Sequence, residues 1–464
     1  MKTVRKYILW QQNCYQNLEQ KLEEYAAQGL CLKKFNSFLW SFEKTQPQKL
    51  KYTITYFSEG SIFNPDYTDN QLTYYEYAEA SGWNLVCERD KIQIFSSVLE
   101  EPVPLETDER EKLENIHQCM KKSLLFPQVI LLLCWIANLI IRIPSIFIRP
   151  TDILANSLQL TTVLMMAIIV SITAYTLFDY YSWYKRSKKS IELGEGIINP
   201  KSKVKRICET CSIVLLFLIV FAMFFQLFQI TSWQLIVLTL GMIPVFLIVF
   251  NGMIAMQKKR KVQAKINKIV TFVVYGLIVI LYCGFIFFMV VRFDFNRPSE
   301  KEYKVVEWKL PSGESQEYRL YNDVIPLTCQ DLFGEIEFEN YSYEKNIEKT
   351  FLLEKVEYSQ DAPPTKENPP EIEYTMYSSS ITWVKELVLK ELLVGDEVFQ
   401  CYSEKTAADV FGAKEAYTFA YTDENTKDYT GDYVLIYNNS IIYLDMGEVL
   451  NDSQKRIIKD KLQV

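Results

Sequence analysis

The chain has 464 residues, enough for two or three domains, and 49% of them are hydrophobic. Its formal net charge of −7 is unevenly distributed, because residues 292–464 carry 34 acidic and 19 basic side chains. That segment has a net charge of −15, which leaves +8 for residues 1–291. The basic part contains long apolar segments, so the charge favours a membrane over nucleic acid as the partner.

The first 50 residues contain no apolar stretch of the kind that a secretory signal peptide needs, so we expect the N-terminus to stay in the cytoplasm. Residues 1–100 predict a small cytoplasmic α+β domain. Its periodicity predicts helices at 15–28 and 71–81 and strands at 3–9, 30–36, 38–43, 51–57, 83–88 and 91–97.

The two helices of this domain end in similar sequences. Tyr25 begins a run that leads through Gly29 into a strand, and Tyr77 begins a run that leads through Gly82 into another. Glycine in this place is typical of a helix C-terminus. Two strand–helix–strand halves predict a ferredoxin-like arrangement, a fold that hosts many functions.

Residues 101–122 are rich in charge and predict a helical connector into a membrane region at 123–291. A membrane-spanning helix needs about 20 predominantly apolar residues. Five segments meet this requirement: 124–141, 153–178, 211–230, 233–256 and 269–291. One such segment could be a buried core helix, but five in succession exceed what a soluble domain can cover. The fold class is therefore five membrane-spanning helices flanked by two α+β domains.

Lysine and arginine in the short loops predict the orientation of the spans, because these residues are enriched on the cytoplasmic side. The loops after the second and the fourth span are strongly basic, and those after the first and the third are not. The residues that determine the orientation are Lys185, Arg186, Lys188, Lys189, Lys203, Lys205, Arg206, Lys258, Lys259, Arg260 and Lys261. We expect a multi-pass protein of the plasma membrane, with a cytoplasmic N-terminus and an extracytoplasmic C-terminus.

No Asp, Glu, Lys or Arg lies in the middle of a predicted span. Ionisable residues in that position mark ion and proton pathways, so their absence argues against a secondary transporter. Pro127 and Pro244 lie inside the first and the fourth span. A kink that the helix bundle tolerates is the favoured interpretation of both, ahead of a broken helix at a substrate site.

Residues 292–464 predict an acidic, extracytoplasmic α+β domain. The expected elements are strands at 302–309, 336–343 and 350–358, a helix at 382–393, a hairpin of 434–437 with 441–444, and a last helix from Asp452 onward. The acidic residues lack the spacing of a calcium-binding loop. We therefore interpret the charge as a contribution to solubility and give cation binding less weight.

No set of residues in the sequence amounts to an active site, and we expect no catalysis, no metal and no cofactor. His117 is the only histidine, which excludes a Ser-His-Asp triad outside the cell and a site with two histidine ligands. Cys208 and Cys211 form a C-x-x-C pair, but no second pair completes a zinc site. Cys329 and Cys401 are the two cysteines of the C-terminal domain, and both a disulfide and two thiols are open alternatives.

The N-terminal segment resembles a known family. The runs KYILWQQN, LEEYAAQGLCLKKF, FLWSFEK, KYTITYF and YYEYAEASGWNLVCERDKIQIF follow one another over about residues 5–97. This order is similar to that of a bacterial membrane-protein family with domain of unknown function 2812. The resemblance implies helical spans, an extracytoplasmic tail and frequent company with PadR-like transcriptional regulators. It implies no activity, because none is established for that family.

Three functional hypotheses follow. The first is a membrane-anchored regulatory or sensing protein, in which the outer domain binds a ligand or wall component and the inner domain contacts a regulator. It rests on the expectation of a folded domain on each side of the bilayer. The alternative is an accessory subunit of a transport or envelope-assembly complex. An enzyme of unknown type is a third and less favoured option.

Overall fold

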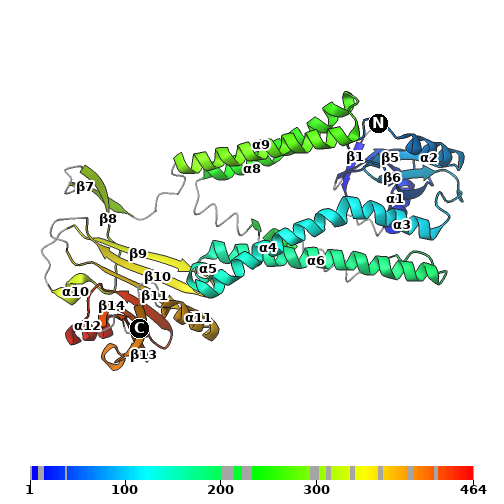
Figure 1. The fold of residues 1–464 in the computed structure, drawn as a ribbon. Coiled ribbons are helices and arrows are strands. Elements are labelled where there is room, and N and C mark those ends of the chain that lie inside the picture. The colour runs from blue at the N-terminus through cyan, green and yellow to red at the C-terminus, as the bar shows by residue number, and fades with distance from the viewer. Residues whose placement is uncertain are drawn as a thin grey trace. The chain divides into compact units, whose positions relative to one another are not determined.

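The computed structural model of the protein describes residues 3–8, 15–36, 39–199, 214–218, 220–221, 233–292, 302–309, 315–334, 340–363, 369–394, 401–422 and 427–462. The chain divides into two compact units (Figure 1). One contains Met1–Ile136, Ile168–Phe217 and Thr231–Phe295, and the other contains Ala137–Ala167, Leu218–Ile230 and Asn296–Val464. Each unit therefore combines a sheet-containing domain with part of the helical region.

The N-terminal domain consists of two halves with the same order of elements. The first half is β1 (Thr3–Tyr7), α1 (Tyr15–Ala27), β2 (Leu30–Lys34) and β3 (Leu39–Lys44), and the second is β4 (Lys51–Tyr56), α2 (Asp69–Ala80), β5 (Asn84–Arg89) and β6 (Ile92–Ser97). In each half the last strand lies between the other two and pairs antiparallel with both. The similar helix ends in the sequence therefore mark a structural repeat.

The ferredoxin-like prediction is correct for each half and wrong for the whole domain. Each half is a split β-α-β unit, which is the motif on which the prediction rested. A ferredoxin-like domain combines its strands in one sheet, whereas the two halves here form separate three-stranded sheets, β1-β3-β2 and β4-β6-β5. The second half completes its own sheet because β5 and β6 form a hairpin, which turns at Asp90 with a φ of 57°.

The glycines that end α1 and α2 are required by conformation and by space. Gly29 has a φ of 78° and Gly82 a φ of 84°, values that side chains with a Cβ rarely adopt. A Cβ on Gly29 would lie 2.6 Å from the carbonyl oxygen of Thr45. Both turns that lead from a helix back into a sheet therefore depend on glycine.

The core of the N-terminal domain extends into the helical region. Trp40, Phe42 and Ile54 are fully buried in it. The same cluster includes Ile116 and Met120 of α3 (Glu109–Met120), and also side chains near the end of α6 (Ser157–Glu192). The domain is therefore packed against these helices through an apolar contact and is not suspended on a linker.

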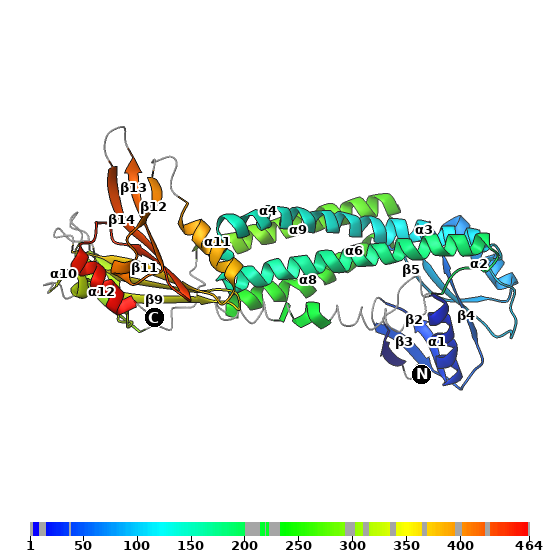
Figure 2. The same cartoon turned by 90° about the horizontal axis from the view of Figure 1, so that it is seen from below.

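The helical region consists of long helices, drawn as coiled ribbons in Figure 2. Helix α3 continues through a π-helical turn (Lys121–Leu125) into α4 (Phe126–Ile148), which gives 40 uninterrupted residues. Helix α6 has 36 residues, about 54 Å at the usual rise per residue. The helices α8 (Trp233–Lys259) and α9 (Ala264–Arg292) pack together, with Phe246 against the ring of Tyr282.

Three helices in the described part of the chain are long and apolar enough to cross a membrane, namely Glu109–Ile148, Ser157–Glu192 and Ala264–Phe285. They contain most of the first, second and fifth predicted spans. The fourth predicted span lies in α8, which is an unbroken helix although Pro244 is inside it. Of the third predicted span, 214–218 and 220–221 are helical, and the remainder lies outside the described residues.

The C-terminal domain is built on a seven-stranded antiparallel sheet, ordered β12-β13-β14-β15-β11-β10-β9. Its strands are β9 (Ser342–Lys349), β10 (Glu354–Asp361), β11 (Ile372–Ser378), β12 (Cys401–Thr406), β13 (Glu415–Thr422), β14 (Lys427–Ile436) and β15 (Ser440–Asp445). A separate hairpin, β7 (Tyr303–Lys309) with β8 (Ser315–Tyr321), precedes them. The expected hairpin of 434–437 with 441–444 is confirmed as β14 and β15.

Helices cover both faces of this sheet. Residues 434 and 435 are neighbours on β14 but belong to different hydrophobic clusters, because successive side chains of a strand point to opposite faces. The cluster with Leu435 contains α12 (Asp452–Leu462) and α10 (Cys329–Phe333), and the cluster with Val434 contains α11 (Thr382–Leu392). The sheet is therefore the middle of three layers, and α11 and α12 lie on opposite sides of it.

One strand prediction in this domain begins too early: the strand expected at 350–358 is β10, which begins at Glu354. Residues 336–339 of the strand expected at 336–343 lie outside the described residues, and β9 begins at Ser342. The apolar residues 351–353 suggested a strand, but they form the turn between these strands. Leu353 is buried in the turn, so its apolar character reflects a tertiary contact and not strand alternation.

The edge strand β4 is covered by side chains of α1. One edge of β4 pairs with β6, and the other presents N–H groups without a neighbouring strand. Glu19 Oε1 accepts a hydrogen bond of 2.7 Å from Ile54 N, and Glu23 Oε1 accepts one of 3.4 Å from Tyr52 N. Residues four apart on a helix thus meet residues two apart on a strand, which connects the two halves of the domain.

Burial of the Glu19 carboxyl, only partly offset by the hydrogen bond from Ile54, raises its pKa to about 7. The unfolded chain, with a carboxyl pKa near its usual value of 4.5, then binds fewer protons than the folded protein between these two values. The stability that the neutral carboxyl contributes is therefore present at low pH and lost as pH rises through about 7.

We expect Glu19→Gln, which keeps the acceptor for Ile54 N and removes the charge, to remove this pH dependence. The variant should match the parent near pH 5 and melt at a higher temperature near pH 8. The measurement is thermal unfolding of the full-length protein in detergent. Glu24→Gln makes the same charge change at an exposed position of α1 and should have no such effect. Equal behaviour of the two variants would contradict the assignment.

Candidate functional site

A short helix between two membrane helices docks on the C-terminal domain. Helix α5 (Pro150–Leu154) follows α4, and its Thr151 is buried. Thr151 N donates to Glu391 Oε2 at 3.0 Å, and its hydroxyl donates to Glu391 Oε1 at 2.8 Å. Both oxygens of one carboxylate on α11 are thus bound by one residue of the membrane region.

Two further polar contacts extend this interface. The hydroxyl of Thr350, in the β9–β10 turn, donates to the carbonyl oxygen of Leu154. Asn156 Nδ2 donates to Glu348 Oε1 at 3.0 Å, while its Oδ1 accepts from Gln159 N at 3.1 Å. Asn156 therefore caps the first turn of α6 and binds the sheet domain at the same time.

Apolar contacts complete the contact area, which we call the α5 interface. It consists of Thr151, Leu154, Ala155, Asn156 and Leu160 on the membrane side and Glu348, Thr350, Leu353, Tyr377, Val384, Val388 and Glu391 on the domain side. Leu154 and Ala155 are almost fully buried. Because this set mixes packing with directed hydrogen bonds, it fixes both the position and the angle at which the helices meet the domain.

Burial raises the pKa of Glu391, and the nearby Asp152 adds to the effect, whereas the hydrogen bonds from Thr151 oppose it. A half-buried carboxylate with two acceptor oxygens needs donors to replace lost water. Thr151 supplies them. The two hydrogen bonds that stabilise the Glu391 carboxylate in the α5 interface therefore come from one residue of the helical region.

At its other end, α6 packs against α3, the helix that follows the N-terminal domain. His117 of α3 stacks on Tyr184 of α6, with ring centroids 4.1 Å apart and planes inclined by 19°. Beyond the helix, Ile197 N donates to Glu109 Oε2 at 3.4 Å, and Asn199 Nδ2 donates to Asn17 Oδ1 at 3.2 Å. His117 therefore packs among the aromatic rings of α6.

The turn between α8 and α9 contacts the N-terminal domain as well. Asn267 is fully buried, and its Nδ2 donates to the carbonyl oxygen of Phe63 at 3.0 Å. The rings of Phe63 and Phe272 lie 6.1 Å apart, and Lys261 forms an ion pair of 3.5 Å with Asp66. The N-terminal domain thus contacts two segments of the helical region. One is the segment after α6, and the other is the turn after α8 together with the start of α9.

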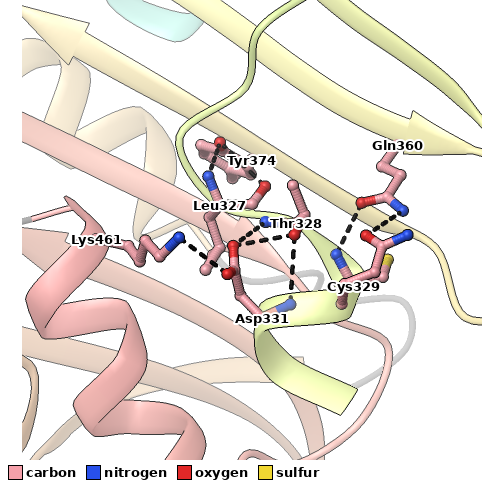
Figure 3. A network of polar contacts seen from close by, with 8 residues as sticks. Leu327, Thr328, Cys329, Asp331, Gln360, Tyr374 and Lys461 are labelled. Carbon is pink, nitrogen blue, oxygen red and sulfur yellow. Dashed lines mark hydrogen bonds and ion pairs between the residues drawn. The ribbon is translucent and has the colours of Figure 1, made fainter. Parts of the chain in front are cut away.

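A buried polar network organises the other face of the C-terminal sheet (Figure 3). The hydroxyl of Tyr374 on β11 accepts from Leu327 N at 3.0 Å. Thr328 and Asp331 form a capping box at the start of α10, and Lys461 of α12 forms an ion pair of 2.9 Å with Asp331. Burial opposes ionisation of Asp331, but hydrogen bonds from Lys461 and Thr328 outweigh it and lower the pKa. The network joins α10, α12 and the sheet.

Cys329 belongs to this network, and the disulfide that was one alternative for it does not form. Its backbone N–H donates to Gln360 Oε1 at 2.7 Å, and its thiol donates to the carbonyl oxygen of Pro370 at 3.3 Å. Cys401 lies in the other hydrophobic cluster, on the opposite face of the sheet. Burial raises the pKa of the Cys329 thiol to about 12, so it is protonated and unreactive at neutral pH.

The basic residues that predicted the orientation lie at helix ends. Lys185, Arg186, Lys188 and Lys189 occupy the last turns of α6, and Lys258 and Lys259 end α8. Arg260 and Lys261 follow in the turn to α9, where Lys261 has a φ of 53°. Lys203, Lys205, Arg206, Cys208 and Cys211 lie outside the described residues.

Within the described ranges, no group of three or more His, Cys, Asp or Glu side chains could hold a metal ion. A hollow of about 410 Å³ lies between the N-terminal domain and Lys258, with Gln71, Glu88 and Asp90 in its lining. It is open and polar, unlike the enclosed apolar pockets that hold small molecules. Among the described residues, the most extensive polar contacts are those between the α+β domains and the helices.

Sequence reasoning missed the α5 interface. Its polar members are common residue types, and those on the domain side are 192 to 240 positions away along the chain. One local signal was present, since Asn156 and Gln159 have the spacing of a helix N-terminus. No local signal distinguishes Glu391 from the other carboxylates of an acidic domain.

These observations define a protein with several helices of membrane-spanning length, each end of α6 being bound to an α+β domain. Residues 15–127 match the model of a family described as a protein of unknown function, DUF2812. The chain thus carries a DUF2812 domain, and the matched segment runs from α1 to the start of α4. No curated protein and no solved structure matches the chain.

We expect Thr151→Val to destabilise the α5 interface by about 1–3 kcal/mol, because it removes one donor to a partly buried carboxylate. Thr151→Ser keeps the hydroxyl and should cost less. Unfolding of the full-length protein in detergent, followed by heat or by proteolysis of the C-terminal domain, measures the difference. Equal losses for valine and serine would mean that the hydroxyl contributes nothing and that packing alone maintains the contact.

Proposed function

We propose that the protein is a membrane-anchored sensing or regulatory protein without catalytic activity. In this proposal the C-terminal domain lies outside the plasma membrane of a bacterial cell and binds a ligand or wall component. The N-terminal domain lies in the cytoplasm and contacts a regulator, for which the family resemblance suggests a PadR-like protein. The observation that carries the proposal is the attachment of one domain to each end of the single helix α6.

The arrangement of contacts also supports five spans with both termini on opposite sides. The N-terminal domain binds the segments that follow α6 and α8, which are next to the two basic loops. The C-terminal domain binds the connection between α4 and α6, which carries little positive charge. Lysine and arginine are enriched in cytoplasmic loops, so these contacts are consistent with a cytoplasmic N-terminal domain and an extracytoplasmic C-terminal domain.

Signal transfer in this proposal passes through the α5 interface. A ligand that moved α11 would move Glu391 and with it Thr151, at the entrance to α6. Coupling between two sites requires two states that both sites bias. The helices α3–α4 and α6 are continuous along the chain between the α5 interface and the N-terminal domain. A transport or envelope-assembly accessory would use the same surfaces for stable subunit contacts.

The orientation is tested by cysteine labelling in intact cells with an impermeant maleimide. The native thiols Cys329 and Cys401 are buried, so exposed positions are used instead. We expect Val449→Cys, at a side chain that is 56% exposed, to react in intact cells. Glu100→Cys, whose side chain is 87% exposed, should react only after lysis. The opposite pattern would invert the orientation, and labelling of both in intact cells would place the domains on one side.

The function is tested by site-specific photo-crosslinking in cells. Tyr77, Val98, Leu99 and Val103 form an exposed apolar area near the end of α2. A photoreactive residue at position 77 should capture a transcriptional regulator, and one at position 24 of α1 should not. The amount captured should change in the Thr151→Val background if the α5 interface transmits a signal. Capture of transport or wall-synthesis subunits, in amounts that Thr151→Val leaves unchanged, would favour the accessory function.

A further inference from the structure

Two large aromatic side chains are exposed on the C-terminal domain beside the α5 interface. Phe351, in the turn between β9 and β10, is 74% exposed, and Trp383, in the first turn of α11, is 49% exposed. A soluble domain rarely presents neighbouring aromatic residues to water without a partner. The position of Phe351 and Trp383 next to α5 indicates what this partner is.

Hydrogen bonds place both residues at the same end of the domain. Ser379 Oγ donates to Leu352 O at 2.7 Å and accepts from Ile381 N at 3.1 Å, so the turn with Phe351 and the start of α11 meet at Ser379. Thr350, next to Phe351, donates to the carbonyl oxygen of Leu154 in α5. The aromatic pair therefore adjoins the connection between two membrane-spanning helices.

This connection must lie at the surface of a bilayer. Helix α4 ends at Ile148, six residues after its single charged residue Arg142, and its Phe147 and Ile148 are exposed in the isolated chain. Helix α5 begins at Pro150, and the next apolar helix begins at Ser157. Eight residues between two apolar helices cannot extend far from the hydrocarbon. The polar headgroup layer beyond the hydrocarbon is about 5–8 Å thick on each side, so the residues bonded to α5 are within or close to it.

We propose that Phe351 and Trp383 insert into the headgroup layer and bind the C-terminal domain to the lipid surface. Tryptophan is enriched in this layer because its ring is apolar and its indole N–H can bond to water or lipid. Lys349 lies two residues before Phe351, and its side chain is 64% exposed while its Nζ forms an ion pair of 2.9 Å with Glu354. In the proposal this lysine exchanges Glu354 for the phosphate of an anionic lipid. The occupant of the surface is thus the bilayer that already surrounds α4 and α6.

The test uses tryptophan fluorescence of the full-length protein in nanodiscs of phosphatidylcholine and phosphatidylglycerol. Part of the phosphatidylcholine carries bromine near the headgroup end of the acyl chains and quenches nearby indoles. The emission of one tryptophan is obtained by subtracting the emission intensity of its Trp→Phe variant from that of the parent protein. We expect the emission that Trp383→Phe removes to lose most of its intensity in brominated nanodiscs, and Phe351→Ser to reduce that loss.

Two matched tryptophans separate this inference from the membrane placement on which it depends. Trp135 lies in α4, so the emission that Trp135→Phe removes should be quenched by bromine deep in the chains. Trp83 is buried in the N-terminal domain, and its emission should be unaffected. Quenched Trp135 with unquenched Trp383 would overturn the lipid contact alone, and a protein would then cover the aromatic pair. Unquenched Trp135 would overturn the membrane placement as well.

Discussion

A helix that crosses a bilayer must satisfy every backbone hydrogen bond within itself, and this constraint determines how the two domains are attached. About 20 apolar residues suffice for the crossing, yet α6 has 36 residues and the α3–α4 helix has 40. The additional turns extend beyond the hydrocarbon, where polar and aromatic side chains are tolerated. Those turns carry the contacts of both domains, with Tyr180 and Trp183 of α6 in the core of the N-terminal domain at one end and Asn156 bound to Glu348 at the other.

Attachment through helix surfaces differs from attachment through a linker. A linker leaves the orientation of a domain free, whereas α5 and α11 are connected by a two-oxygen contact within a packed apolar cluster. The π-helical turn at Lys121–Leu125 interrupts the regular geometry of the α3–α4 helix without breaking it. Single π-turns within α-helices are frequent at functional sites, because they offer an alternative local geometry at small cost. The turn at Lys121–Leu125 lies between α3, which packs against the N-terminal domain, and the apolar helix α4.

Local patterns predicted those parts of the structure that local physics determines. The glycines at 29 and 82 ended both helices correctly because a positive φ is a property of the residue itself. Apolar runs predicted the spans, and alternation predicted the strands of the N-terminal domain. Residues 351–353 are apolar like a strand but form a turn, because a turn with a buried residue such as Leu353 and a strand can have the same composition. The separation of β1–β3 from β4–β6 could not be predicted, because which strands pair is decided by non-local contacts.

The α5 interface shows why specificity, more than strength, distinguishes a site of this kind. A buried carboxylate with two hydrogen bonds contributes little net stability, since the gain is offset by the loss of water around the charge. The carboxylate does, however, raise the free energy of every arrangement of the two surfaces in which its oxygens lack hydrogen-bond donors. Both carboxylate oxygens of Glu391 accept hydrogen bonds from Thr151, so these bonds are lost when Thr151 moves away. Asn156 donates to Glu348 while it caps the first turn of α6, so this bond depends on where α6 begins. A contact with a narrow range of accepted geometries converts a small displacement of α11 into a loss of bonding at α6. That sensitivity is the physical property a signal would require at this point of the chain.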